Sequence, residues 1–246
     1  MQTTDNESRT PEGGLVVNPN KEETRVVDGV TYSRFGVRTH VLDQSDDICE
    51  VAQRYVGPLI EPGDTIFLSE KALGCTQGRA VKLTDIHPRP LARLLSRFVT
   101  KTPAGIGLGM PETMEMAFQE VGTARILLAT VAAVAGKLVG KRGWFYLVAG
   151  RKAASIDGPC SYTLPPYNQY VSLAPAEPSQ ACEDIARALG GEVSVAVIDL
   201  NDLGGEVLGS YGLPYSPETL IEILRDNPLG QESQCTPFGI IRAHKA

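Results

Sequence analysis

The chain has 246 residues, of which 42% are apolar and 21% charged, a length and composition typical of a globular protein that can bury a large core. Its formal net charge of −6 argues against electrostatic binding to nucleic acid or to an anionic membrane. The 25 glycines and 17 prolines exceed average usage and indicate many turns. Fibrous, disordered and membrane-embedded classes are therefore excluded for the chain as a whole.

Hydrophobic patterning predicts a mixture of strands and helices after a polar start. Residues 1–24 offer little apolar surface to bury, so we expect a disordered tail over 1–24 and a single folded unit over 25–246. In chain order, the predicted elements are a strand over 32–42, a helix from Ser45 to Tyr55, a strand over 65–69, a helix from Pro90 to Phe98, a long helix from Pro111 to about Val139 with a candidate break at Gly122, a strand over 144–148, a helix from Ser179 to Leu189, a strand over 193–198, a helix from Ser216 to Leu224 and a strand over 238–242. This order indicates an α/β or mixed α+β fold.

The cysteines and the lengths of the apolar runs indicate in which cellular compartment the protein is expected. The five cysteines form no C-x-x-C pair, which is typical of reduced thiols in a cytoplasmic protein, and the three histidines show no zinc-site spacing. The longest apolar run, 126–136, is about half a bilayer crossing, and residues 1–24 lack the features of a signal peptide. We expect a cytoplasmic protein with neither a membrane nor a nucleic-acid partner.

A glycine-rich loop is the first candidate binding segment. Gly105, Gly107 and Gly109 alternate just before the helix that Pro111 begins, a position from which backbone N–H groups can face a phosphate. The spacing matches neither a P-loop nor a dinucleotide-binding fingerprint. A ligand contact and a plain turn both remain open here.

Two cations flank a second loop, over 70–79, which follows the predicted strand 65–69. Lys71 and Arg79 lie among hydroxyl and amide side chains and form a candidate phosphate clamp. The alternative is a solvated turn.

Carboxylates in or just after apolar runs are the candidate metal ligands. Asp157 lies in one such position, and Asp199 and Asp202 lie in another. Hard cations such as Mg²⁺ or Mn²⁺ prefer carboxylate oxygens on rigid turns beside strand ends. Asp199 and Asp202 could equally cap a turn at Gly204.

Several of these segments, taken in order, resemble motifs of the coenzyme F420-0:γ-glutamyl ligase family. The segment from Gly63-Asp64 through Lys71 to Gly78-Arg79 is similar to the family's Gly-Asp…Lys…Gly-Arg motif, and Ser155-Ile156-Asp157 is similar to its Gly-Val-Asp stretch. Weaker similarities lie at 173–178, 201–205 and 230–242. The resemblance spans roughly 35–242.

The resemblance implies a mixed α/β ligase fold with mixed sheets, present as an intertwined homodimer. It implies a nucleotide-dependent amide ligase that joins an amino acid, L-glutamate in the family, to a small-molecule carboxylate through an acyl phosphate. GTP or ATP would be the co-substrate, and Mg²⁺ or Mn²⁺ the metal.

The resemblance also implies roles for individual residues. Lys71 would contact nucleotide phosphate, Asp157 and Asp202 would ligate metal with Asp199 in reserve, and Gln231, in the polar loop 228–234, would assist metal or phosphate binding. Arg79 is a candidate catalytic clamp for a carboxylate, and the alternating glycines at 105, 107 and 109 are candidate nucleotide contacts.

The chain departs from the family's motifs at three places. Gly74-Cys75 stands where the family has a serine, Pro159 replaces part of a Ser-Asn pair, and Gly205-Glu206 lacks an arginine. Two alternatives therefore stay open. One is a nucleotide- or cofactor-binding protein without ligase activity, and the other is a ligase for a substrate unrelated to F420, such as a folate or a secondary metabolite.

Overall fold

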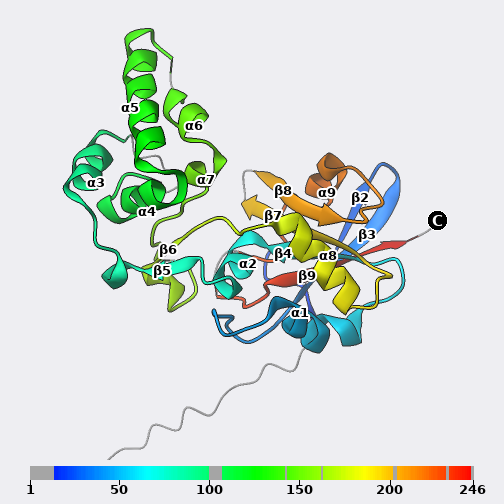
Figure 1. Ribbon diagram of the computed structural model, residues 1–246. Coiled ribbons are helices and arrows are strands. Elements are labelled where there is room, and N and C mark those ends of the chain that lie inside the picture. The colour runs from blue at the N-terminus through cyan, green and yellow to red at the C-terminus, as the bar shows by residue number, and fades with distance from the viewer. Residues whose placement is uncertain are drawn as a thin grey trace, which may run out of the picture. The chain divides into compact units, whose positions relative to one another are not determined.

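The computed structural model describes residues 14–99, 107–141, 143–161, 163–201, 204–230 and 233–244. The chain divides into two compact units: unit 1 comprises Met1–Thr76 and Glu177–Ala246, and unit 2 comprises Gln77–Ala176. Helices and strands occur in both units (Figure 1), which confirms the predicted mixed α/β class.

Unit 1 is built on a seven-stranded sheet with the order β1-β3-β9-β4-β7-β8, in which β2 also pairs with β3. Only β4 and β7 run parallel among these described strands; the other neighbours are antiparallel. The strands are β1 (Leu15–Val16), β2 (Thr24–Val27), β3 (Val30–Val37), β4 (Thr65–Ser69), β7 (Ser194–Asn201), β8 (Gly204–Tyr211) and β9 (Phe238–His244).

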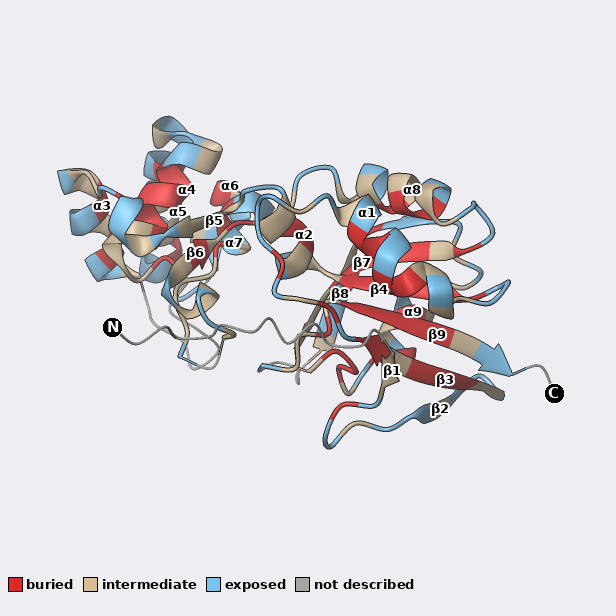
Figure 2. Cartoon of the chain, turned by 90° about the horizontal axis from the view of Figure 1, so that it is seen from below, coloured by how far each residue is buried: buried red, intermediate tan, exposed pale blue. Residues whose placement is uncertain are grey.

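Both faces of this sheet are buried because its central strands alternate between two apolar clusters. In β4, Ile66 and Leu68 face one cluster and Phe67 faces the other. Helices α1 (Ile48–Val51) and α8 (Pro178–Ala188) cover the first face, and α9 (Pro217–Ile223) covers the second. Figure 2 shows the resulting continuous burial along β4, β7 and the start of β9. Near-continuous apolar runs are what a doubly covered sheet requires.

Unit 2 is mainly helical. Its helices are α3 (Pro90–Leu95), α4 (Pro111–Val121), α5 (Thr123–Leu138), α6 (Trp144–Ala149) and α7 (Arg151–Ala154), and its two-stranded sheet pairs β5 (Ala80–Lys82) with β6 (Tyr170–Ser172). A separate apolar cluster joins α3, α4, the inner face of α5 and β6.

The chain bends sharply between α4 and α5. Gly122 adopts φ 86° at the junction, a conformation that favours glycine, and the two helices meet at 117°. Within the described residues no single helix combines the length and apolar character needed to cross a bilayer; α4 and α5 meet that criterion only when they are taken together.

Most predicted elements are confirmed. β4 has the predicted bounds, Pro90 and Pro111 begin α3 and α4, the break lies at Gly122, and the Ser216 side chain caps α9 by accepting the Thr219 backbone N–H. The predicted strands at 193–198 and 238–242 are β7 and β9. The helix after Ser45 begins at Ile48, with Asp47 as its cap, and continues as a π-helical turn over Ala52–Val56.

Four predictions are wrong. The strand predicted over 32–42 is β3, which ends at Val37. Residues 144–148 form helix α6, because Phe145, Val148 and Ala149 meet the core at helical spacing. The predicted loop 70–79 begins as helix α2 (Glu70–Thr76), which buries Leu73 against the sheet. The described part of the expected tail is also structured, since Leu15–Val16 pair with β3 and Asn18 is buried.

Candidate functional site

The parallel strands of unit 1 bring two of the predicted site residues to one edge of the sheet. Ser69, the last residue of β4, pairs with Ile198 of β7, so Lys71 lies just beyond the end of β4, and Asp199, still within β7, lies one residue past that pair. In open α/β sheets, ligands bind outside the carboxyl ends of such strands. Lys71 and Asp199 therefore lie on the side of the sheet where a ligand is expected.

Helix α2 determines how Lys71 is presented. The helix starts directly at the end of β4, and Leu73 and Gly74 are its buried residues. Lys71 lies in the first turn and is exposed. Burial of Leu73 thus fixes the helix, and Lys71 lies on its exposed side.

Asp199 has a second carboxylate opposite it, one that sequence reasoning did not select. Strands β7 and β8 pair in a register that places Asp199 directly across from Glu206. Directly opposed side chains have Cβ atoms roughly 5 Å apart, and two carboxylates there repel each other unless a cation lies between them. The segment 204–211 shows no alternation of polar and apolar residues, because Val207 and Leu208 are adjacent and pack toward opposite apolar clusters, so it gave no signal for this carboxylate. Asp202 lies outside the described residues.

The segment that leads into β9 ends at the same edge. The Ser69 backbone N–H donates to the Pro237 carbonyl at 3.0 Å, which ties the start of β9 to the end of β4. Buried Asn18 donates through Nδ2 to the Pro228 carbonyl at 2.7 Å and to Thr236 Oγ1 at 3.0 Å. These contacts hold both ends of the loop in which the sequence places Gln231, which itself lies outside the described residues.

In unit 2, one strand end brings Asp157 and Arg79 together. Asp157 and Ser172 exchange two backbone hydrogen bonds, each 2.9 Å long, and the Leu173 N–H donates to the Arg79 carbonyl at 3.0 Å. The two predicted residues therefore flank consecutive positions at the end of β6.

The Arg79 side chain is held within unit 2. Its Nε donates to the Ala174 carbonyl, and its Nη2 lies 2.8 Å from Glu120 Oε2, with both side chains largely buried. Glu120, on α4, was not predicted, because nothing in its sequence neighbourhood marks it as a partner of Arg79. The pair orients the guanidinium, and neither contact uses Nη1.

The described end of the glycine-rich loop is anchored. Gly107 has φ 49°, and a Cβ built there would lie 3.3 Å from the Tyr146 hydroxyl. Leu108 is buried. Burial raises the pKa of Tyr146, and a hydrogen bond from the Leu108 backbone partly offsets that increase. Gly109 follows, whereas Gly105 lies outside the described residues.

Donor chemistry at the unit 1 edge suits a hard cation. Asp199 and Glu206 supply carboxylate oxygens, which Mg²⁺ and Mn²⁺ prefer. Across the described ranges no three His, Cys, Asp or Glu side chains are grouped as metal ligands, so a full coordination shell needs further donors. The five cysteines, all of them described, form no disulfide, and burial raises the pKa of Cys182 to about 12, which disfavours its thiolate.

The described site residues thus form two groups. In unit 1, Lys71 and Asp199 lie at the sheet edge. In unit 2, Arg79 and Asp157 lie at the end of β6, and Gly107 and Gly109 lie elsewhere in that unit. Three predicted residues lie outside the described residues: Gly105, Asp202 and Gln231.

Comparison with known proteins gives one family. The family model described as F420-0:Gamma-glutamyl ligase matches residues 36–207, which is more than half of the chain and includes both groups of residues. No curated protein matches the chain.

Proposed function

The chain belongs to the F420-0:γ-glutamyl ligase family, and on this premise we propose that it is a GTP- or ATP-dependent amide ligase that joins an amino acid to a small-molecule carboxylate. The observation that carries the proposal is the family match over 36–207, together with the shared sheet edge of Lys71 and Asp199. L-Glutamate is the proposed amino acid, and a homodimer the proposed active form.

The proposed reaction has two transfers. An oxygen of the substrate carboxylate attacks the γ-phosphorus, the bond between that phosphorus and the bridging oxygen breaks, and the nucleoside diphosphate leaves. The amine nitrogen then attacks the acyl carbon, the bond from that carbon to the phosphate oxygen breaks, and inorganic phosphate leaves while the nitrogen loses a proton. Phosphoryl transfer of this kind depends mainly on positioning and on neutralising charge.

In this mechanism each site residue has one role. Lys71 offsets charge on the transferred phosphoryl group, and Arg79 binds the substrate carboxylate through Nη1. Within unit 1, Asp199 and Asp202 hold Mg²⁺ or Mn²⁺ with help from Gln231, and Glu206 is a further donor; within unit 2, Asp157 is a separate proposed metal ligand. When bound, the metal supplies charge neutralisation for the nucleotide phosphates. Backbone N–H groups at Gly105, Gly107 and Gly109 contact the nucleotide.

A nucleotide-turnover assay tests the proposal. The full chain is incubated with GTP or ATP, Mg²⁺ or Mn²⁺, candidate carboxylates and a panel of amino acids, and nucleoside diphosphate and amide product are measured. Amine-dependent diphosphate formation is expected. Nucleotide binding without any such turnover would favour a binding protein, which is the alternative that the departures at Gly74-Cys75 and Glu206 support.

Substitutions then test the assigned roles. Lys71→Ala should lower kcat by about 10²–10³, the usual effect of losing one electrostatic contact to a developing charge. Lys137→Ala, at an exposed lysine on α5, is the matched control and should leave kcat unchanged. Asp199→Asn should raise the metal concentration needed for half-maximal rate, whereas Asp184→Asn, at a side chain that is 43% exposed on α8, should not. Full metal-dependent turnover in both Asp157→Ala and Asp202→Ala would contradict the metal assignment.

A further inference from the structure

Strand β3 ends at the same edge of the unit 1 sheet as β4. Val37 of β3 pairs with Phe238 of β9, and Phe238 pairs on its other side with Leu68 of β4. Both pairings are antiparallel, so β3 and β4 run in the same direction on either side of β9. The carboxyl end of β3 therefore lies at the edge where Lys71 follows β4, and Figure 1 shows helix α2 at that edge, beside the start of β9.

Arg38 is the residue that follows β3, and sequence reasoning did not select it. Arg38 is exposed, and it makes no hydrogen bond or ion pair with any residue that the structure describes. Other arginines of unit 1 are paired within the chain: Arg34 pairs with Asp226, and Arg242 pairs with Asp64. Within the described residues, no carboxylate therefore neutralises the charge of Arg38.

The backbone that carries Arg38 is held against the segment that precedes β9. The Thr39 N–H donates to the Cys235 carbonyl at 3.0 Å, and Thr39 is fully buried. A Cβ at Gly36 would lie 3.1 Å from the Cβ of Thr236, so the missing side chain lets this segment approach β3. A side chain on a backbone that is already ordered costs less entropy to immobilise on binding. This anchoring therefore favours Arg38 as a ligand contact.

The positive charge of Arg38 lies close to the loop in which the sequence places Gln231. Burial raises the pKa of Cys235, near the end of that loop, and the charge of Arg38 partly offsets this increase. The same segment is tied to β4, since the Ser69 N–H donates to the Pro237 carbonyl at 3.0 Å. Contacts from β3 and from β4 therefore hold the segment before β9, and Arg38 follows the first of these strands.

The spacing of Arg38 and Lys71 suits a chain of phosphate groups. Neighbouring strands lie about 4.8 Å apart, so β3 and β4, on either side of β9, are separated by about 10 Å. Two long cationic side chains that start from these strand ends can contact different phosphate groups of one nucleoside triphosphate. An arginine offers a phosphate group two parallel N–H donors, whereas a lysine acts as a point charge.

A nucleotide phosphate is the oxyanion that the position of Arg38 favours. Lys71 and Asp199, at the same edge, have the proposed roles of phosphate contact and metal ligand, whereas Arg79, the proposed clamp for the substrate carboxylate, lies in unit 2. A triphosphate also carries more negative charge than a single carboxylate, so it gains more from a second cation.

We propose that Arg38 binds a phosphate group of the nucleotide at the carboxyl edge of the unit 1 sheet. The proposal adds a residue to the nucleotide site and so rests on that part of the proposed function. It does not depend on amide formation, because its test measures nucleotide binding rather than turnover.

Calorimetric titration of the full-length chain with GTP and with ATP, in the presence of Mg²⁺, provides the test. For the nucleotide that the wild type binds, Arg38→Ala should raise Kd about 10- to 100-fold, the usual effect of losing hydrogen bonds between charged groups. Arg38→Lys should raise Kd less, because it keeps the charge and loses only the paired donors. Circular dichroism verifies that each variant is folded.

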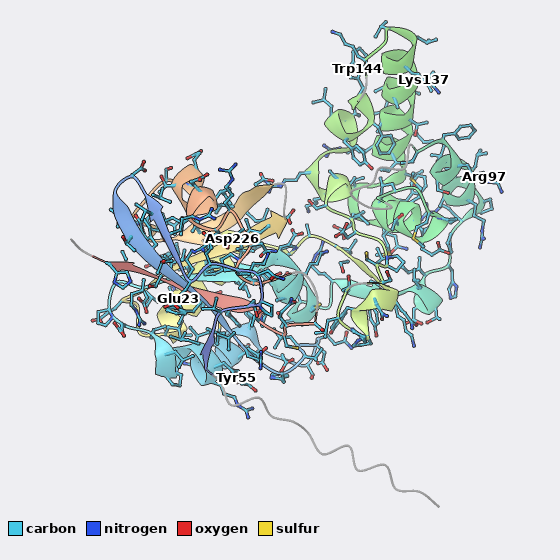
Figure 3. All side chains as sticks on the ribbon, turned by 180° about the vertical axis from the view of Figure 1, so that it is seen from behind. Glu23, Tyr55, Arg97, Lys137, Trp144 and Asp226 are labelled. Atoms are coloured by element: carbon cyan, nitrogen blue, oxygen red, sulfur yellow. The ribbon has the colours of Figure 1, made fainter. Side chains whose placement is uncertain are left out.

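Arg97→Ala is the matched control. Arg97 lies on the helical turn η4 (Ser96–Phe98) of unit 2 and is labelled in Figure 3. Like Arg38, it is exposed and makes no hydrogen bond or ion pair with a residue in the described ranges. The same substitution there should leave the nucleotide Kd unchanged.

A rescue experiment separates a direct contact from a structural role. Because Arg38 is exposed, free guanidinium ion can reach the space that its side chain leaves in Arg38→Ala. Millimolar guanidinium should restore part of the nucleotide affinity of Arg38→Ala and should not change that of Arg97→Ala. Failure of guanidinium to restore any affinity, when Arg38→Lys binds as weakly as Arg38→Ala, would overturn the direct contact.

The remaining outcomes distinguish this proposal from the proposed ligase. Equal nucleotide affinity in wild type and Arg38→Ala would overturn the Arg38 contact and leave the ligase standing. An unchanged nucleotide Kd with a raised KM for the carboxylate substrate would also overturn it, because the guanidinium would then bind the substrate. Weaker nucleotide binding in Arg38→Ala, in a protein that forms no amide, would support the contact and overturn the ligase. A wild type that binds neither nucleotide would overturn both.

Discussion

Both units bury an ion pair, but they bury opposite members of it. In unit 1, Arg34 is 0% exposed and its partner Asp226 is 21% exposed, whereas in unit 2 Glu115 is 4% exposed and its partner Arg89 is 40% exposed. A buried charge is stable only while its partner remains. Removing the carboxylate of the pair should therefore lower the free energy of unfolding much more in unit 1 than in unit 2.

The unit 1 pair joins distant parts of the chain. Arg34 on β3 pairs with Asp226 beyond α9 and donates to the carbonyls of Ile223, at 2.9 Å, and Glu22. Figure 3 labels Asp226. Because Arg34 cannot reach water without moving the sheet or α9, its charge depends on Asp226.

The largest expected effect is that of Asp226→Ala. Removing the carboxylate leaves the Arg34 charge buried, and we expect the free energy of unfolding of unit 1 to fall by about 3–5 kcal/mol. Urea unfolding followed by circular dichroism measures it. The matched control is Asp184→Ala, which breaks an exposed pair with Arg187 on α8 and should cost less than about 0.5 kcal/mol. Equal losses in the two variants would show that burial of Arg34 does not determine the effect.

The intermediate effect is that of Glu115→Ala in unit 2. Glu115 accepts from the Arg89 backbone N–H at 3.0 Å and from its guanidinium, and so holds the start of α3 against α4. Arg89 is already partly hydrated, so its charge regains water when the carboxylate is removed. We expect a loss of about 1.5–3 kcal/mol, the usual contribution of hydrogen bonds to a charged group.

Fluorescence offers a direct measurement for unit 2, because the single tryptophan, Trp144, lies on α6. The urea concentration at the midpoint of the Trp144 fluorescence change should fall in Glu115→Ala and should fall less in Asp226→Ala. A loss in Glu115→Ala as large as that in Asp226→Ala would remove the distinction between the two pairs.

Local patterns explain why much of the fold could be predicted. β4 has its predicted bounds because Thr65–Ser69 is a short apolar run between a turn and a helix, and α9 begins as predicted because Ser216 and Pro217 are a cap and a first-turn residue. The segment 144–148 was wrongly predicted as a strand because a short aromatic and apolar run is equally compatible with a strand and with a helix. Only its contacts with the core decide between the two.

The candidate site depends on contacts that local sequence does not encode. Lys71 and Asp199 lie near the same end of the parallel pair because of the register of β4 and β7, and Glu206 faces Asp199 only because β8 pairs with β7. Asn18 reaches Pro228 across 210 positions of sequence. The residue types could be selected from the sequence, but their partners required the topology of the sheet.

The smallest expected effect is on acid stability. Burial raises the pKa of Asp226, but hydrogen bonds from Arg34 and the Glu22 backbone, with the Arg34 charge, outweigh it and leave the pKa below its usual value. For Glu115, burial likewise raises the pKa, and the contacts with Arg89 and Gln119 more than offset it. Each carboxylate therefore binds its proton less readily in the folded chain than in the unfolded one.

This difference sets the direction of the pH dependence. The unfolded pKa values are about 3.9 for Asp and 4.3 for Glu, so the stabilisation is fully present above this range and is lost as the pH falls through the lower folded values. We expect the free energy of unfolding to decline below about pH 4, and to decline less steeply in Asp226→Ala and in Glu115→Ala, because each lacks one of the two groups. Urea titrations from pH 7 to pH 3 measure it. Parallel curves for wild type and Asp226→Ala would contradict the assignment, since the Arg34 contacts would then contribute nothing to acid sensitivity.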